Sequence, residues 1–336
     1  MNIRAFRTLW LVVALALSLA ACAGPRAQAD LVSSQQEPAA PAATLTPAPS
    51  PTPTPRPTAT QTVEPTPSGP WTVLAEATYT HRSTYTGFLD ETFGLTVGYA
   101  GEVHYTHDGG QSWSTSVSSS ACRFGLEIID AQTAIHCGNL GHVRLSVDGG
   151  KKFSAVTSFG RSEPAQCRYL SFIDATTGWA AAPGQLGVTT DGAQTWTELA
   201  LPDDMGSILA ISLYSASQGY LLDDHGLLFV TTDGGQTWTS QVLNFLEGAE
   251  TSAAPSPRMA MRFGDGGVGM IVYQRGNLDE GFYTYAAHTA VGGETWTEEQ
   301  VPVGVGIPNL YLARDGVTLT ASNAVKKTIL VLRYVE

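Results

Sequence analysis

The strongest candidate for metal or acid–base chemistry in this sequence is the run Asp223-Asp224-His225-Gly226, because carboxylates and an imidazole can hold a cation or move a proton. The run falls where a connection between two strands is expected, so we interpret it as an acidic turn. The histidines show no recognisable ligand spacing: His81, His104, His107, His136, His142, His225 and His288. No Ser-His-Asp order or phosphate-binding loop stands out either. The sequence therefore predicts no catalytic residue, no metal site and no cofactor.

Three cysteines stand beyond residue 22, and their spacing suits no zinc site. Cys122-Arg123-Phe124 and Cys167-Arg168-Tyr169 lie at similar points in successive repeats of the sequence. This similarity allows a Cys122–Cys167 disulfide between neighbouring repeats. The alternative is that Cys122, Cys137 and Cys167 are all unpaired, buried thiols.

The elements that would position such groups come from a repeated turn, clearest at Thr231-Thr232-Asp233-Gly234-Gly235-Gln236-Thr237-Trp238. Its Asp recurs at steps of 40, 43 and 42 residues, and a degenerate fifth copy has Val291 in place of Asp. Asp-Gly between β-rich runs is a hairpin signal, the Asp can accept turn N–H groups, and the Trp offers a large apolar face. We assign a structural role to Asp108, Trp113, Asp148, Phe153, Asp191, Trp196, Asp233, Trp238 and Trp296.

A second turn precedes each Asp-Gly turn, clearest at Leu170-Ser171-Phe172-Ile173-Asp174-Ala175-Thr176-Thr177-Gly178-Trp179. Alternate positions before its Asp are nearly all apolar, as a half-buried strand requires. One repeat thus contains four antiparallel strands, and a period near 42 residues is typical of a β-propeller. Residues 71–336 suffice for six blades, whereas seven would require roughly 294 residues at this period.

The last repeat stops after three strands, and its fourth is expected at the other end of the domain. Trp71-Thr72-Val73-Leu74 resembles Trp196-Thr197-Glu198-Leu199. We therefore predict an all-β, six-bladed propeller of four-stranded antiparallel blades, closed when residues 71–76 pair with residues 327–335. Closure in this way leaves no open sheet edge at the seam.

The first 70 residues are expected to precede the folded domain. Residues 1–22 have Arg4 and Arg7 before an apolar run, and they end in Leu19-Ala20-Ala21-Cys22, which resembles a bacterial lipoprotein signal with Cys22 as the lipidated residue. Residues 23–70 hold 12 of the 19 prolines, so we predict a disordered Pro/Thr/Ala-rich linker. The resemblance implies an exported protein anchored by lipid on the extracytoplasmic side of the cell membrane.

The net charge of −12 and the absence of a basic run argue against nucleic acid as a partner. The Asp-Gly-Gly-Gln-Thr-Trp repeats resemble those of Asp-box (BNR) propellers. With the Phe172–Trp179 motif, the chain also resembles the photosystem II stability/assembly factor-like family. That family is typically seven-bladed and implies a non-catalytic module that binds protein partners.

The rival interpretation is a sialidase-like or other glycoside hydrolase, since six-bladed sialidases also resemble this chain in repeat and blade number. Their chemistry needs an arginine triad, a Tyr–Glu nucleophile pair and an acid/base Asp. The arginine cue before the first Asp box is absent, although Arg123, Arg168, Arg258 and Arg262 could still cluster. Two-carboxylate hydrolysis finds no recognisable pair.

Two charged residues are expected in the central channel. Glu127 and Arg262 each stand three residues before a turn Asp, in repeats 2 and 5, which oppose each other in a ring of six. Small residues hold most of the matching positions, as a crowded axis requires. The alternative is that Arg262 pairs with a carboxylate nearby in sequence.

The ligand is expected at blade 5, whose connections are longer than those of other blades. Residues 247–257 and 274–282 are predicted as enlarged loops on the face opposite the tight turns, which we call the loop face. Long loops on a rigid scaffold are where binding sites are built. The candidate ligand-binding residues are Arg258, Arg262, Arg275, Asn277, Asp279, Glu280 and Tyr283. The sequence thus favours a membrane-tethered propeller that binds a protein or a glycan.

Overall fold

The computed structural model describes residues 69–79, 83–98, 101–116, 123–138, 140–160, 167–249, 258–277, 279, 281–306, 308–323 and 325–335. All of them belong to one compact unit, Val63–Glu336. The predicted signal peptide and nearly all of the predicted linker lie outside the described residues. No helix within the described ranges has the length and apolar character needed to cross a membrane.

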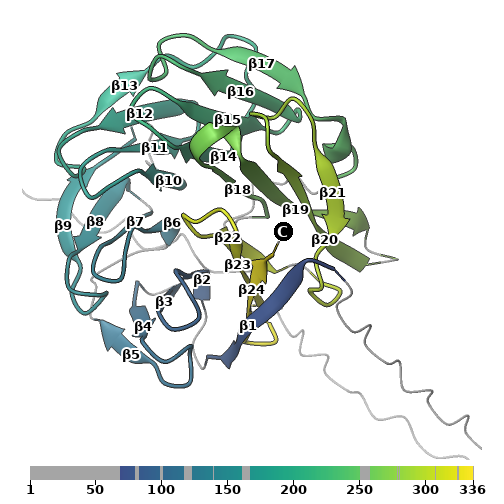
Figure 1. Cartoon of the computed structure of the whole chain (residues 1–336). Coiled ribbons are helices and arrows are strands. Elements are labelled where there is room, and N and C mark those ends of the chain that lie inside the picture. Colours follow the sequence, from purple (N-terminus) through teal and green to yellow (C-terminus); the bar gives the residue numbers. More distant parts are fainter. Residues whose placement is uncertain are drawn as a thin grey trace, which may run out of the picture. The chain divides into compact units, whose positions relative to one another are not determined.

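The described residues form six four-stranded antiparallel sheets, arranged around a central axis (Figure 1). From the axis outward, blades 1 to 3 contain β2 (Ser83–Phe88), β3 (Gly94–Gly98), β4 (Val103–Thr106), β5 (Ser114–Ser116); β6 (Arg123–Ile128), β7 (Ala134–Gly138), β8 (His142–Ser146), β9 (Ser154–Ser158); and β10 (Tyr169–Phe172), β11 (Gly178–Ala182), β12 (Gln185–Thr189), β13 (Thr197–Leu199). Blades 4 to 6 contain β14 (Ile208–Leu213), β15 (Gly219–Asp223), β16 (Leu227–Thr231), β17 (Thr239–Val242); β18 (Ala260–Phe263), β19 (Gly269–Asn277), β20 (Gly281–Thr289), β21 (Thr297–Gln300); and β22 (Asn309–Leu312), β23 (Thr318–Asn323), β24 (Thr328–Tyr334), β1 (Trp71–Thr78). The predicted six-bladed propeller is confirmed.

The ring closes through the first described strand, as the sequence predicts. β1 pairs antiparallel with β24, from Trp71 opposite Tyr334 to Thr78 opposite Thr328. Each innermost strand also contacts the innermost strands of both neighbouring blades, and β22 contacts β2 across the seam. Because β1 begins where β24 ends, the chain enters the ring on the face that carries the tight turns.

The Asp-Gly turns between the third and fourth strands are organised by hydrogen bonds from the turn to one carboxylate. In blade 4, Asp233 accepts the Thr237 N–H at 2.9 Å, and Thr231 Oγ1 both donates to Asp233 at 2.8 Å and accepts the Gly235 N–H at 2.9 Å. Hydroxyl and amide donors in the turns lower the pKa of Asp108, Asp191 and Asp233 to about 2. The turn carboxylates therefore remain charged across the ordinary pH range.

The turns between first and second strands explain the Asp-x-x-x-Gly spacing. Asp174 Oδ1 accepts the N–H groups of Thr176 and Thr177 at 2.7 Å, which closes the turn. The glycine that ends the turn lies under the aromatic ring that precedes it. A Cβ on Gly178 would lie 2.4 Å from Phe172, so that no larger residue fits without moving the ring. The motif thus specifies both the turn and the packing beside it.

One disulfide lies between blades 2 and 3, and it differs from the expected pairing. Cys137 of β7 is bonded to Cys167, with a Cα–Cα distance of 5.6 Å. Both residues are fully buried, and the Cys167 N–H donates to the carbonyl of Gly138 at 3.2 Å. The prediction of a Cys122–Cys167 bond is wrong, because this backbone contact brings Cys167 against β7. Cys122 itself lies outside the described residues.

The longer of the two connections expected in blade 5 is largely regular strand. Residues 274–282 were expected as an enlarged loop, but Gln274, Arg275, Gly276 and Asn277 continue β19 and pair with β20 as far as Gly281. Backbone pairing satisfies N–H and C=O groups that an irregular loop would leave to water. The insertion is therefore an extended hairpin. The second insertion, residues 247–257, lies mostly outside the described residues, and Ala249 forms an isolated bridge with Arg275.

Candidate functional site

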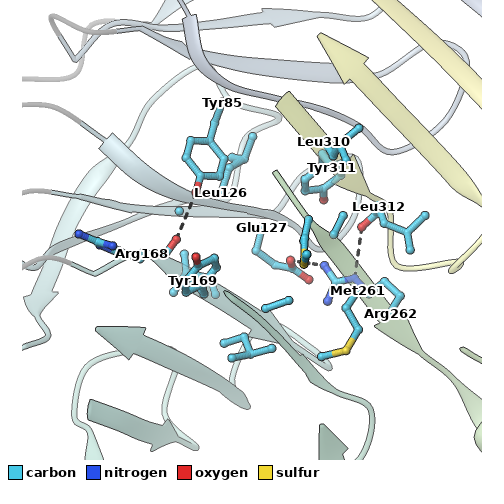
Figure 2. Close-up of a pocket in the computed structure, with 16 residues that line it drawn as sticks. Tyr85, Leu126, Glu127, Arg168, Tyr169, Met261, Arg262, Leu310, Tyr311 and Leu312 are labelled. Carbon is cyan, nitrogen blue, oxygen red and sulfur yellow. Dashed lines mark hydrogen bonds and ion pairs between the residues drawn. The ribbon is translucent and has the colours of Figure 1, made fainter. Parts of the chain in front are cut away.

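The central channel is closed by a buried ion pair, Arg262 to Glu127 (Figure 2). Its side chains come from blades 5 and 2, and they are 8% and 1% exposed. Arg262 also donates to Ser171 Oγ at 3.0 Å and to the Leu312 carbonyl at 3.3 Å. The Arg262 guanidinium thus joins residues from four blades, and it pairs with a carboxylate across the ring rather than with one nearby in sequence.

The position three residues before each first turn has a common role in the ring. Ser171 accepts the Leu213 N–H and Ser212 accepts the Phe263 N–H, both at 2.9 Å, and each donor belongs to the next blade. A hydrogen bond from the Phe172 amide likewise lowers the pKa of Glu127. Small polar residues at this position therefore hold adjacent inner strands together.

The hollow on the loop-face side of the ion pair is small. It has a volume of about 60 Å³ and is lined by residues of all six innermost strands, among them Tyr85, Tyr169 and Tyr311. Small-molecule sites usually have volumes of about 300–1,000 Å³, so this hollow has no room for a sugar ring. Figure 2 shows Glu127 and Arg262 directed toward each other within this lining.

Electrostatics in the channel do not favour a tyrosine nucleophile. Burial raises the pKa of the Tyr311 hydroxyl, and the negative charge of Glu127 raises it further. Burial likewise raises the pKa of Tyr169 to about 12. Burial also raises the pKa of Glu127, while Arg262 opposes that shift. Among the described lining residues, Glu127 is the single carboxylate and it is already paired.

The ligand-binding residues predicted for blade 5 do not all meet. Arg262 lies in the channel, because its position in β18 points toward the axis, and its buried guanidinium is not available on the loop face. Arg258 lies just before β18 and is half-buried. Arg275 and Tyr283 face each other in the extended hairpin, and Glu280 lies outside the described residues.

Arg275 is held firmly in the hairpin by charged and aromatic neighbours. Its Nη2 donates to Glu298 at 2.8 Å and to the Tyr273 hydroxyl at 2.9 Å, and it also bonds the Phe245 carbonyl. The guanidinium carbon lies 4.8 Å from the Tyr285 ring centroid. Guanidinium groups at such distances are attracted to aromatic faces. This arrangement makes the base of the hairpin rigid.

The tip of the hairpin is polar and exposed. The Asp279 N–H donates to Asn277 Oδ1 at 2.9 Å, which organises the turn. Both residues are exposed, whereas Phe282 and Tyr283 are half-buried. The structure thus places Asn277, Asp279 and Tyr283 together with Arg275 on one element, apart from Arg262.

The acidic run Asp223-Asp224-His225 does form a cluster whose ligand atoms lie within 4.8 Å of one another. However, the carboxylate of Asp223 accepts the N–H groups of Gly206, His225 and Leu227, at 2.8 to 3.0 Å. Asp224 accepts the Ser207 N–H at 2.8 Å. These bonds tie the connection after β15 to the segment before β14, in keeping with an acidic turn.

Arg314 is the residue that sequence reasoning missed. It stands directly before the turn residue Asp315, and it donates to the carbonyl of Ile129 at 3.0 Å and to that of Ile173. A signal was present, because the same position holds Leu89, Ile129, Ile173, Tyr214 and Gly264 in the other blades. A single charge in an otherwise uncharged column marks a special site at the axis.

No family model matches this chain, and no curated protein matches it. Among solved structures, the chain is similar to the WD40 β-propeller domain of Doa1, with 9% identity, coverage of 78% of this chain and 96% of that chain, and a TM-score of 0.50. It is also similar to YCF48 from Cyanidioschyzon merolae (15% identity, 79% and 98% coverage, TM-score 0.48) and to YCF48 bound to a D1 peptide (16% identity, 80% and 96% coverage, TM-score 0.47). The likeness to the Doa1 domain shows the fold alone.

Proposed function

We propose that this chain is a membrane-tethered, extracytoplasmic propeller that binds a protein or glycan partner without transforming it. The observation that carries the proposal is the extended hairpin of β19 and β20, whose ladder continues to Asn277 and Gly281. The hairpin presents an exposed polar tip on a base stiffened by Arg275, Tyr273 and Glu298. Pre-organised surfaces of this kind lose little entropy when a partner binds.

The extracytoplasmic location is supported by the disulfide and by the first 22 residues. Disulfides persist in oxidising compartments such as the bacterial periplasm and the cell surface, and Cys137–Cys167 is such a bond. The apolar run that ends at Cys22 adds a lipid-anchoring signal. The Pro-rich linker would then separate the propeller from the membrane.

The channel geometry argues against the glycoside hydrolase alternative. Two-carboxylate hydrolysis needs a second acid beside Glu127, and the described channel lining contains none. A Tyr–Glu nucleophile pair needs an ionisable tyrosine, whereas burial keeps Tyr311 protonated. A direct assay for release of sialic acid or xyloglucan fragments tests this alternative, and measurable turnover by the purified domain would revive it.

The binding proposal is tested by shortening the hairpin and measuring partner capture from the native membrane by crosslinking. Residues 275–282 are replaced by a tight connection like Ala182-Pro183-Gly184-Gln185, which joins β11 and β12 in blade 3. We expect lost capture and an unchanged six-bladed fold. Asp279→Ala with Tyr283→Ala tests the tip with less change to the ladder. The matched control is Gln185→Ala, at the equivalent end of blade 3.

Capture that survives both hairpin changes would move the binding site away from blade 5. Treatment of the membrane with protease or with glycosidases before capture separates the two partner classes. Loss of capture after protease indicates a protein, and loss after glycosidases indicates a glycan.

A further inference from the structure

A second cavity lies on the tight-turn side of the Arg262–Glu127 pair. Its volume is about 290 Å³, and it is lined by Arg262, Arg314 and apolar or aromatic residues at the ends of the innermost strands: Phe172, Ile173, Leu213, Tyr214 and Phe263, with Gly264. Because first strands end at the tight turns, this cavity faces away from the blade 5 hairpin. It is therefore independent of the binding surface proposed above.

Arg314 crosses the mouth of this cavity from blade 6. Its guanidinium bonds the carbonyls of Ile129 in blade 2 and Ile173 in blade 3, and blade 3 is opposite blade 6 in the ring. Arg314 forms no ion pair with any residue that the structure describes. A guanidinium held by carbonyl oxygens keeps its full charge and has further N–H donors to offer.

The charges around the cavity do not balance. Arg262 and Arg314 contribute two guanidinium groups, whereas Glu127 supplies one carboxylate, which pairs with Arg262. Asp174, whose pKa is lowered by its turn hydrogen bonds and by Arg314, turns its carboxylate to the amides of its own turn. Asp315 likewise accepts the Val317 and Thr318 N–H groups at 3.0 and 2.8 Å. One positive charge therefore remains at the mouth.

The walls of the cavity decide what kind of anion would fit. Phe172, Leu213 and Phe263 are buried, and Ile173 and Tyr214 are half-buried, so the walls are largely apolar. A phosphate monoester carries nearly two charges at neutral pH, which one uncompensated guanidinium does not match. A carboxylate carries one charge and accepts two parallel hydrogen bonds from a guanidinium. The volume lies near the lower limit of about 300 Å³ for small-molecule sites.

We propose that this cavity binds a small carboxylic acid with an apolar body. The carboxylate contacts the free N–H groups of Arg314 at the mouth, and the apolar body packs against Phe172, Leu213 and Phe263. Binding adds the negative charge that the two arginines and Glu127 leave uncompensated. It also joins blade 6 more firmly to blades 2 and 3, because the ligand holds Arg314 in place.

The test uses benzoate as the probe, with calorimetric titration into residues 69–336. Benzyl alcohol tests the need for charge, and inorganic phosphate tests the need for a carboxylate. We expect benzoate to bind at least tenfold more tightly than either compound. Arg314→Gln should weaken benzoate by tenfold or more, since hydrogen bonds between charged groups are the strong ones. Arg333→Gln is the control, since it removes an exposed arginine in the same blade.

Several results would overturn the proposal. These are the absence of benzoate binding up to roughly 10 mM, far weaker than the ~1 mM at the weak end of measurable affinities, benzyl alcohol or phosphate binding as tightly as benzoate, or equal affinity in Arg314→Gln. Should Arg314→Gln unfold, the three-compound comparison on the unchanged protein still decides. Nuclear Overhauser contacts between benzoate and the rings of Phe172 and Phe263 locate the bound probe. Contacts elsewhere would also refute the site.

Discussion

Arg262 of blade 5 forms an ion pair with Glu127 of blade 2, the blade directly opposite in the ring. The two residues are 135 positions apart in sequence, and they meet because both occupy the third position before a tight turn. The contact spans the axis and divides the space there into a small hollow on the loop face and a larger cavity on the tight-turn face. The pair is thus both a structural bridge and a barrier.

Removal of one partner from this bridge should destabilise the domain strongly. Glu127→Ala leaves the buried Arg262 charge without its carboxylate, and such changes cost about 3–5 kcal/mol. The double variant Glu127→Leu with Arg262→Met should recover most of that loss, because both charges are then absent. Urea unfolding measures both variants, with the exposed Glu91→Ala as control. A cost below about 1 kcal/mol for Glu127→Ala, the range of a surface pair, would contradict this account.

The Cys137–Cys167 disulfide should contribute measurably to stability. Cys137→Ser is expected to lower the free energy of unfolding by about 2–5 kcal/mol, as removal of native disulfides commonly does. Reduction of the unchanged protein should have a similar effect, and reduction of Cys137→Ser should add little. Peptide mapping without reductant checks the pairing directly. A Cys122–Cys167 peptide in that map would refute the assignment.

Ring closure by β1 should be required for a cooperative fold. Without residues 69–78, β24 has an unpaired edge and Trp71 no longer packs against Tyr334, at a centroid distance of 5.5 Å. We expect faster proteolysis and a lost cooperative melting transition. A chain that begins at Gly69 is the control and should melt normally. Addition of a peptide of residues 69–79 should restore part of the transition, and unaltered melting of the truncated chain would disprove closure by this strand.

Acid should weaken the domain through the Asp-Gly turns. Asp108, Asp191 and Asp233 have pKa values of about 2 in the folded chain, against an ordinary value of 3.8. The folded state therefore binds these protons less readily than the unfolded state, and the stabilisation is present above the ordinary pKa. It should be lost progressively as the pH falls from about 4 to about 2.

The variant with all three residues changed to Asn should have a lower melting temperature at neutral pH and a shallower decline in acid. Some decline should remain, since hydrogen bonds also lower the pKa of Asp90 and Asp174. Melting temperatures measured across this pH range in both proteins provide the check. Parallel curves for the two proteins would show that these carboxylates do not determine the acid response.

Cys22 should be required for the proposed membrane anchoring. Metabolic labelling with a radioactive fatty acid should mark the native protein, and Cys22→Ser should be neither labelled nor retained in the membrane fraction. Cys122→Ser is the matched control, because it also removes one cysteine and leaves the signal unchanged. Retention of Cys22→Ser in the membrane, with processing at the same bond, would refute the lipid anchor.

The sequence by itself determined the propeller, its blade number and its closure. Turn spacing and apolar alternation are local properties that repeat every 40 or so residues, and Gly178 and Asp174 show their physical cause within a few positions. The shared position of Glu127 and Arg262 before their turns also places both at the axis by the same periodicity. These features depend on neighbours along the chain, so they can be deduced without coordinates.

Only the tertiary structure decided which residues meet across blades. The partner of Cys167 is Cys137, because a backbone contact between blades brings these strands together. Gln274 to Asn277 extend a hairpin instead of forming a loop, since their backbone groups find partners in β20. Arg314 reaches blades 2 and 3 because ring closure brings blade 6 opposite them. Periodicity specifies each blade, whereas such long-range contacts arise from the geometry of the closed ring.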